Sequence, residues 1–175
     1  MRGFRRFGGT ASAHARGARR TVVDAVIVVT PTRTHKDLVL LCAGARKPAF
    51  CEKPPALGLA DAHIMKEALQ GGGFLQMGFM RRFDPGYVAA RAKLNEGRIG
   101  KLVLFKSTSR DPSPPPLAYA DPRNSGGLIL DLGIHDFDLA RFFVGAVKRV
   151  SAIGGAEIGG EKSQIGSTVR AEGRR

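Results

Sequence analysis

The hydrophobic residues of this chain fall into short runs that alternate between two periodicities. Residues 24–29 form a continuous valine-rich run, which predicts a strand buried on both faces. Thr34 can then cap a helix that continues to about Arg46, and we expect its apolar face to be Leu38, Leu41 and Cys42. Further strands are predicted at about 49–52 and 74–78, with a helix at about 59–70 between them that ends at three glycines.

This order, strand-helix-strand-helix-strand, predicts parallel strands joined by right-handed crossovers. The predicted fold class is therefore α/β, the second half of a Rossmann-type doubly wound parallel sheet. The pattern changes near residue 80. There the sequence predicts a helix at about 85–96, a longer alternating strand at 101–109, a long amphipathic helix at about 127–144 and a strand near 149–153. Such a change indicates part of an α+β domain.

We accordingly divide the chain into four segments. They are a disordered leader at 1–20, a partial Rossmann domain at 21–80, a partial α+β substrate and catalytic domain at 81–155, and a disordered tail at 156–175.

Charge adds a competing hypothesis, because the net charge of +13 is typical of nucleic-acid-binding proteins. The leader alone holds six arginines and no acidic residue, whereas residues 21–150 hold 18 basic and 12 acidic residues. The part expected to fold is thus only mildly basic, and we expect no nucleic-acid partner. The alternative is a basic nucleic-acid-binding protein, or a non-catalytic binding protein derived from the same fold.

No apolar run approaches the roughly 18 residues that a membrane span needs, so we expect no membrane partner. The two cysteines, Cys42 and Cys51, have no metal-ligand spacing and are too few for a disulfide scaffold. We interpret them as buried reduced thiols of a cytoplasmic protein, and we expect no metal site.

Polar residues follow the first two predicted strands, where open α/β sheets bind ligands. Residues 30–35 read Thr-Pro-Thr-Arg-Thr-His, which by itself is also an ordinary turn. Glu52 and Lys53 precede two prolines. A lysine here can stabilise the alkoxide character that develops in alcohol oxidation, although a solvated Glu-Lys pair is the simpler interpretation of so short a motif.

Asp131 and His135 stand four residues apart on the predicted long helix, so both project from one face. An aspartate can orient an imidazole, and alcohol oxidation needs a base that takes the hydroxyl proton while hydride leaves the carbon. A surface pair with this spacing is common. The apolar neighbours Leu128, Leu132 and Ile134 nevertheless predict partial burial of the pair.

Five motifs occur in order: Thr-Pro-Thr-x-Thr-His, Glu-Lys-Pro, Gly-Phe-Met-Arg-Arg-Phe-Asp-Pro, Ser-Arg-Asp-Pro, and Gly-Gly-x-x-x-Asp-x-x-x-His-Asp-x-Asp. Together they resemble the glucose-fructose oxidoreductase and inositol dehydrogenase (Gfo/Idh/MocA) family, and most of all inositol 2-dehydrogenases. The resemblance covers about residues 22–155. It implies oxidation of a polyol or sugar such as myo-inositol to its 2-keto form, with NAD or NADP as cofactor, in a homo-oligomer.

The resemblance also implies roles for individual residues. The catalytic set would be Lys53, Asp131 and His135. The cofactor-binding residues would be Thr30, Pro31, Thr32, His35, Glu52 and Lys53, and the substrate-binding residues Met80, Asp111 and Asp138. The family's opening Gly-x-Gly-x-x-Gly turn, which holds the pyrophosphate, does not occur in this sequence. We therefore expect a fragment that lacks the amino-terminal dinucleotide-binding half and is inactive alone.

Overall fold

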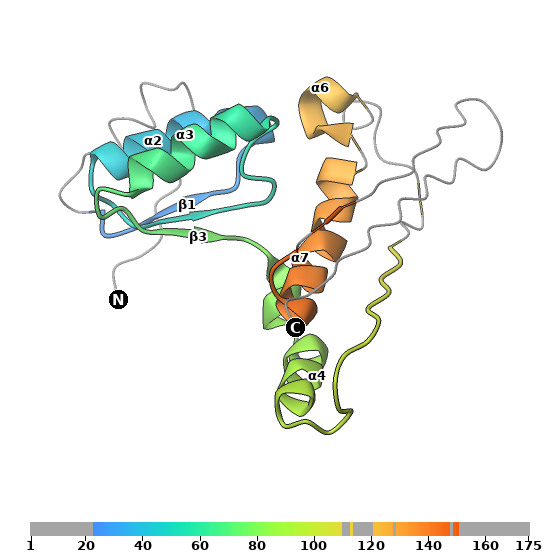
Figure 1. Ribbon diagram of the computed structural model, residues 1–175. Helices are drawn as coiled ribbons and strands as arrows, with labels where there is room; N and C mark the ends of the chain where they lie inside the picture. The colour runs from blue at the N-terminus through green and yellow to red at the C-terminus, as the bar shows by residue number, and fades with distance from the viewer. Residues whose placement is uncertain (1–22, 110–112, 114–120, 128, 148, 151–175) are drawn as a thin grey trace. The chain divides into compact units, whose positions relative to one another are not determined.

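The computed structural model describes residues 23–109, 113, 121–127, 129–147 and 149–150, in two compact units that divide between Gly78 and Phe79 (Figure 1). The predicted leader, the whole of the predicted tail and Asp111 lie outside the described residues. Among the described segments, no helix is long and apolar enough to cross a membrane.

The first unit is built on a parallel sheet with the strand order β1-β2-β3. The strands are β1 (Val26–Val28), β2 (Ala49–Cys51) and β3 (Leu75–Met77). Ala49 lies opposite Val26 on one side and Leu75 on the other, so the three strands are in simple register. The predicted parallel α/β arrangement is confirmed.

Two helices pack on this sheet, α2 (His35–Gly44), which follows a 3-10 turn η1 (Thr32–Thr34), and α3 (Leu59–Leu69). Figure 1 shows both helices on the same face of the sheet. The buried stripe of α2 is His35, Val39 and Cys42, which corrects the predicted face. Thr34 is the N-cap residue of α2, but the predicted side-chain cap was wrong, because its hydroxyl accepts from no helix amide and instead donates to the Pro31 carbonyl at 2.8 Å.

The core of this unit lies between the sheet and the helices, with Val28, Val39, Cys51, Ala56 and Met65 buried at its centre. Burial alternates along β1, since Val28 is 2% exposed and Ile27 is 49% exposed. The prediction that this strand is buried on both faces was therefore wrong. Both helices cover the face that carries Val28, and the face that carries Ile27 receives neither of them.

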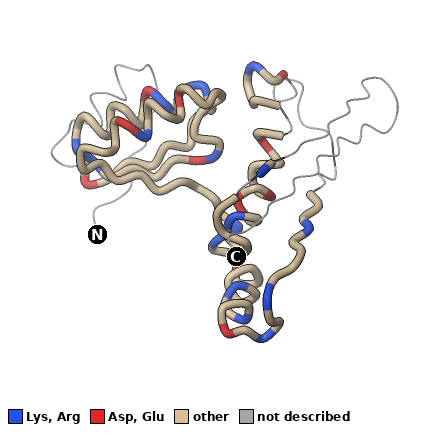
Figure 2. Tube along the Cα trace, viewed as in Figure 1, with Lys and Arg blue, Asp and Glu red and all other residues tan. Residues whose placement is uncertain are grey.

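Charges of both signs mark the outer surface of the helices. Figure 2 shows basic and acidic residues interspersed along α2 and α3. Lys36 of α2 pairs with Asp61 of α3 at 2.9 Å, and this hydrogen bond raises the pKa of the lysine. The pair lies at the surface and so contributes little to stability.

The second unit is mainly helical in its described residues. It contains a 3-10 turn η2 (Met80–Phe83), α4 (Pro85–Asn95), a short α6 (Pro122–Ser125), a π-helical turn η3 (Ile129–Gly133) and α7 (Ile134–Val144). The predicted helix at 85–96 is confirmed. Its start is fixed by Asp84, whose carboxylate accepts hydrogen bonds from the Gly86 and Tyr87 amides at 2.8 and 3.3 Å.

The helix predicted at about 127–144 is confirmed for residues 129–144, although its first part is a π turn and not regular α-helix. Gly126 and Gly127 adopt left-handed conformations with φ of +80° and +79°, which end α6 and separate it from the next turn. Residues 129–133 then form a π turn, and a regular α-helix begins only at Ile134. The hydrophobic pattern shows which residues face inward, but it does not register a change in the number of residues per turn.

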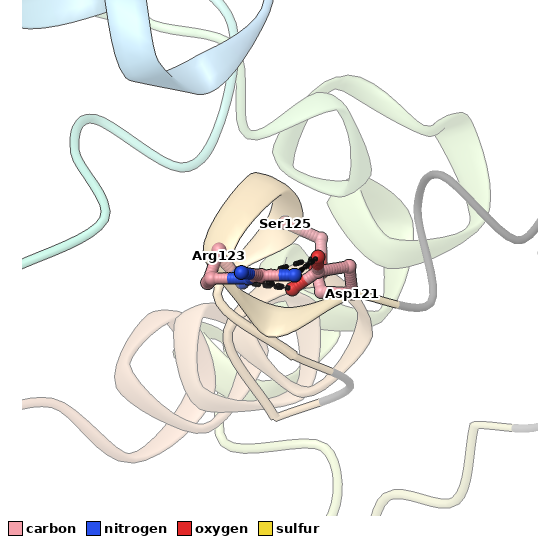
Figure 3. A network of polar contacts seen from close by, with 3 residues as sticks. All are labelled: Asp121, Arg123 and Ser125. Carbon is pink, nitrogen blue, oxygen red and sulfur yellow. Dashed lines mark hydrogen bonds and ion pairs between the residues drawn. The ribbon is translucent and has the colours of Figure 1, made fainter.

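A local polar network stabilises the turn that precedes this break (Figure 3). Asp121 caps α6 by accepting from the Arg123 amide at 2.9 Å, and its carboxylate also binds the Arg123 guanidinium at 2.6 Å. These hydrogen bonds lower the pKa of Asp121. The Ser125 hydroxyl donates to the Asp121 carbonyl at 3.4 Å and accepts from the Gly127 amide at 3.0 Å, which links the cap to the left-handed glycines.

The predicted strand at 101–109 was also wrong, because residues 102–109 pair with no strand among the described residues. Val103 and Leu104 are 93% and 78% exposed there. Alternation of apolar residues suits a strand, but a strand forms only where a second one completes its ladder of hydrogen bonds. Of the strand predicted near 149–153, residues 149 and 150 carry no strand and the remainder lies outside the described residues.

Candidate functional site

The carboxyl ends of the three parallel strands meet at one edge of the first unit. The Glu52 amide donates to the Val28 carbonyl at 3.0 Å, and the Gly78 amide donates to the Cys51 carbonyl at 2.8 Å. Each strand pair is therefore extended by one hydrogen bond at this edge. The loops that begin at Thr30 and Glu52 are brought together here, as expected for polar residues that follow adjacent parallel strands.

Hydrogen bonds between two threonine hydroxyls and a backbone carbonyl stabilise the first loop. The Thr30 and Thr34 hydroxyl oxygens lie 2.7 Å apart, and Thr34 donates in turn to the Pro31 carbonyl. Thr32 is buried, with 6% of its surface exposed, whereas Pro31 is exposed. Of the cofactor-binding residues predicted here, Thr30 and Pro31 thus present surface at the strand end, and Thr32 packs inside the loop.

His35 connects this loop to the second one. Its ring is 1% exposed, with Nδ1 2.8 Å from the Pro54 carbonyl oxygen and Nε2 2.8 Å from the Thr30 carbonyl oxygen. The predicted cofactor contact would need a group open to a ligand. In this structure the imidazole instead faces two backbone carbonyls of its own unit.

The second loop carries Glu52 and Lys53, both half-buried, followed by a cis peptide bond to the buried Pro54. The Glu52 carboxylate lies across the end of β3, since a methyl group on Gly78 would stand 3.0 Å from its Oε2 atom. Glycine is the residue that leaves room for this close approach. Lys53 is therefore in a loop whose conformation is fixed from both neighbouring strands.

Asp131 and His135 belong to the second unit. His135 is 7% exposed and lies in the first turn of α7, and Asp131 is half-buried within the π turn. The predicted partial burial is confirmed. The regular α-helical spacing that the sequence analysis assumed between them does not hold, because a π turn has more residues per turn than an α-helix.

Two arginines that sequence reasoning missed anchor α7 beside His135. Arg82 forms an ion pair with Asp138. Its Nε atom lies 3.0 and 2.8 Å from the two carboxylate oxygens, and a terminal guanidinium nitrogen lies 2.7 Å from Oδ1. Arg81 binds Asp136 at 3.0 Å. The hydrogen bond to Asp138 raises the pKa of Arg82. These pairs join η2 to α7 across more than 50 residues, a distance over which no sequence pattern indicates pairing.

The proposed substrate-binding residues differ in their surroundings. Met80 is 67% exposed, and Asp138 is 8% exposed with its carboxylate engaged by Arg82. Asp111 lies outside the described residues. Asp136 lies nearby in the sequence and binds two serines. Its Oδ1 accepts a hydrogen bond from the Ser107 hydroxyl and another, at 2.9 Å, from the Ser109 hydroxyl.

The cysteines agree with the sequence prediction, because Cys42 and Cys51 are both buried free thiols. Burial raises the pKa of both, and that of Cys51 rises to about 12, with smaller contributions from Glu52 and Cys42. Within the described segments, no group of three His, Cys, Asp or Glu residues could hold a metal ion.

Comparison with known proteins gives matches over both units. Residues 10–79 match the oxidoreductase family with an NAD-binding Rossmann fold, and residues 87–172 match the GFO/IDH/MocA C-terminal domain. The chain is 44% identical over 146 residues to myo-inositol 2-dehydrogenase of Thermotoga maritima, which covers 82% of this chain and 43% of that protein. It is 42% identical to scyllo-inositol 2-dehydrogenase (NAD(+)) of Bacillus subtilis, over 71% of this chain and 36% of the relative.

Solved structures give the same result. A myo-inositol dehydrogenase of Corynebacterium glutamicum matches with a TM-score of 0.70 at 32% identity, over 89% of this chain and 51% of that one. Scyllo-inositol dehydrogenase of Lactobacillus casei with bound NAD(H) and scyllo-inositol matches with a TM-score of 0.69 at 32% identity, over 82% and 44%. The chain spans less than half the length of the curated relatives named here. None of these matches favours the nucleic-acid alternative, and the chain belongs to the Gfo/Idh/MocA oxidoreductase family.

Proposed function

We propose that this chain carries the catalytic residues of an NAD-dependent dehydrogenase that oxidises an inositol, most simply myo-inositol at its 2-position. The observation that carries the proposal is the 44% identity to myo-inositol 2-dehydrogenase over 146 residues. In a chain of 175 residues, any stretch of that length includes positions 53 to 135. The similarity therefore extends over Lys53, Asp131 and His135.

The roles follow from the chemistry of alcohol oxidation. His135 accepts the hydroxyl proton, and Asp131 orients the imidazole. Lys53 donates a hydrogen bond to a substrate hydroxyl oxygen and stabilises the negative charge that develops on it. Bound NAD⁺ supplies the hydride acceptor. Asp138 and Met80 are proposed substrate contacts, as is Asp111.

The first unit offers a donor set that suits a dinucleotide. Thr30 and Lys53 present polar side chains, and Pro31 an exposed ring, at the carboxyl ends of parallel strands, where such ligands bind in open α/β sheets. The sequence holds no Gly-x-Gly-x-x-Gly turn, which would supply the amides for the pyrophosphate. We therefore propose that the 175-residue chain alone binds NADH weakly and does not turn over.

The test compares the chain itself with an extended chain that adds the flanking segments of the T. maritima relative. Myo-inositol oxidation is followed by NADH formation. In the extended chain, Lys53→Met should lower turnover on the order of 100-fold, and His135→Ala should lower it on the order of 100- to 10,000-fold. Thermal unfolding is measured in parallel, to separate lost chemistry from lost structure.

Matched controls come from α3, where Lys66 and His63 are exposed. Lys66→Met and His63→Ala make the same chemical changes and should leave turnover within about twofold, as surface substitutions away from a site usually do. Full turnover in His135→Ala would refute the assigned base. An extended chain that oxidises no inositol would refute the proposed function.

A further inference from the structure

His35 lies between the two loops that hold the proposed cofactor and catalytic groups of the first unit. One ring nitrogen is 2.8 Å from the carbonyl of Pro54, the residue directly after Lys53, and the other is 2.8 Å from the carbonyl of Thr30. The ring is 1% exposed, and Pro54 is fully buried. One side chain therefore bridges the ends of β1 and β2.

Both contacts call for a hydrogen-bond donor on the imidazole ring. A backbone carbonyl only accepts hydrogen bonds, whereas a neutral imidazole donates from one nitrogen and the imidazolium donates from both. A buried carbonyl left without a donor costs the free energy of its desolvation. Water cannot easily replace the ring, because His35 and Pro54 are both enclosed.

We propose that His35 is a positioning residue, which fixes the Pro54 carbonyl to the Thr30 loop and thereby holds Lys53 in place. The link to catalysis rests on the proposed function of Lys53, but the structural part does not. Lys53 is half-buried and is bonded directly to the residue that His35 holds. A shift of the Pro54 carbonyl moves the Lys53 backbone with it.

The alternative is that His35 only fills space in the buried stripe of α2, together with Val39 and Cys42. Two substitutions distinguish these roles. The amide group of Asn reaches about as far as Nδ1 and that of Gln about as far as Nε2, and both can donate hydrogen bonds. His35→Asn thus retains a donor toward Pro54, and His35→Gln retains one toward Thr30.

The experiment measures hydrogen exchange of single backbone amides in the 175-residue chain. The reporter is the Glu52 amide, which donates to Val28 at the start of the Lys53 loop, and the reference is the Gly78 amide on the other side of β2. We expect His35→Gln to accelerate exchange at Glu52 about 10-fold relative to Gly78, as loss of one buried hydrogen bond predicts. His35→Asn should remain within about threefold of the wild type. Thr34→Val is the matched control, because it removes the Thr34 hydroxyl contacts and leaves the Pro54 contact intact.

A second measurement follows turnover in the extended chain. His35→Gln should lower kcat about 10-fold relative to the wild type, with little change in KM for NAD⁺. His35→Asn should keep kcat close to the wild-type value. Equal exchange at Glu52 in the Asn and Gln variants would show that His35 only packs, and would overturn the inference. If the extended chain is inactive throughout, the proposed function fails while the exchange result still decides the positioning role.

Discussion

Replacing Arg82 with leucine tests whether the Arg82–Asp138 pair holds the second unit together. Asp138 is 8% exposed, and Arg82 is its partner through three short contacts between 2.7 and 3.0 Å. The guanidinium also lies over the Phe142 ring, 5.5 Å from its centroid. Arg82→Leu leaves the carboxylate buried with its guanidinium removed.

The expected loss of stability depends on how deeply each partner of the ion pair is buried. Removing one partner of a fully buried ion pair costs about 3–5 kcal/mol. The Arg82 side chain is 39% exposed, so water can partly replace it. We therefore expect a loss of about 2 kcal/mol in the free energy of unfolding of this unit, roughly 8–16 °C in Tm for a unit of this size. Arg82→Lys keeps the charge but loses the two-pronged geometry, and should cost about half as much.

The assay is thermal and urea unfolding of the 175-residue chain, with a double-mutant cycle. Arg82→Leu combined with Asp138→Leu removes both charges and should cost at least 1 kcal/mol less than the sum of the single changes, to an accuracy of about 0.5 kcal/mol. The control is Arg141→Leu on α7, the helix that also carries Asp138. Arg141 is exposed, so its replacement should change the free energy of unfolding by no more than about 0.5 kcal/mol. Additive single changes would refute the reasoning that the pair acts as a buried unit.

Three further predictions concern other parts of the chain. Gly78→Ala should cost about 1–2 kcal/mol in unfolding experiments, because the new methyl group meets Glu52 and Phe50 at 3.0 Å, whereas Gly44→Ala, with no atom within 4 Å, should be neutral or stabilising. Cys51 has its pKa raised to about 12, so the unfolded chain loses this proton first, and stability measured against pH should fall from about pH 9 upward. Cys51→Ala should lack that part of the fall. Asp84→Ala removes the cap of α4 and should lower stability by about 1 kcal/mol, and Asp84→Asn by less.

The sequence was sufficient to predict the first unit almost completely. Its strands and helices are local patterns that end at glycines and prolines, and parallel pairing follows from their alternation. The errors concerned the buried face of α2, the side-chain cap at Thr34 and the burial of β1, where a run of apolar residues was taken to mean two covered faces. Ile27 is apolar and yet 49% exposed, so hydrophobicity alone does not report what lies opposite a strand.

The second unit was harder to predict because its structure depends on partners and on backbone conformation. The alternating residues 102–109 form no strand among the described residues, and a π turn replaces regular α-helix in the first part of the helix predicted at 127–144. The spacing of hydrophobic residues along the sequence predicts neither of these two features.

The same distinction separates the candidate residues that sequence could find from those it could not. Residues that follow a strand, such as Thr30 and Lys53, are located by local order, because every parallel strand ends at the same edge of the sheet. The contacts that position such residues appear only in the structure, where His35 lies against the Pro54 carbonyl and Arg82 binds Asp138. A motif therefore predicts which groups take part in chemistry. How accurately those groups are placed depends on contacts with other residues, which no motif describes. Substitutions at His35 and Arg82 are for that reason the sharper test of how this fold supports its site.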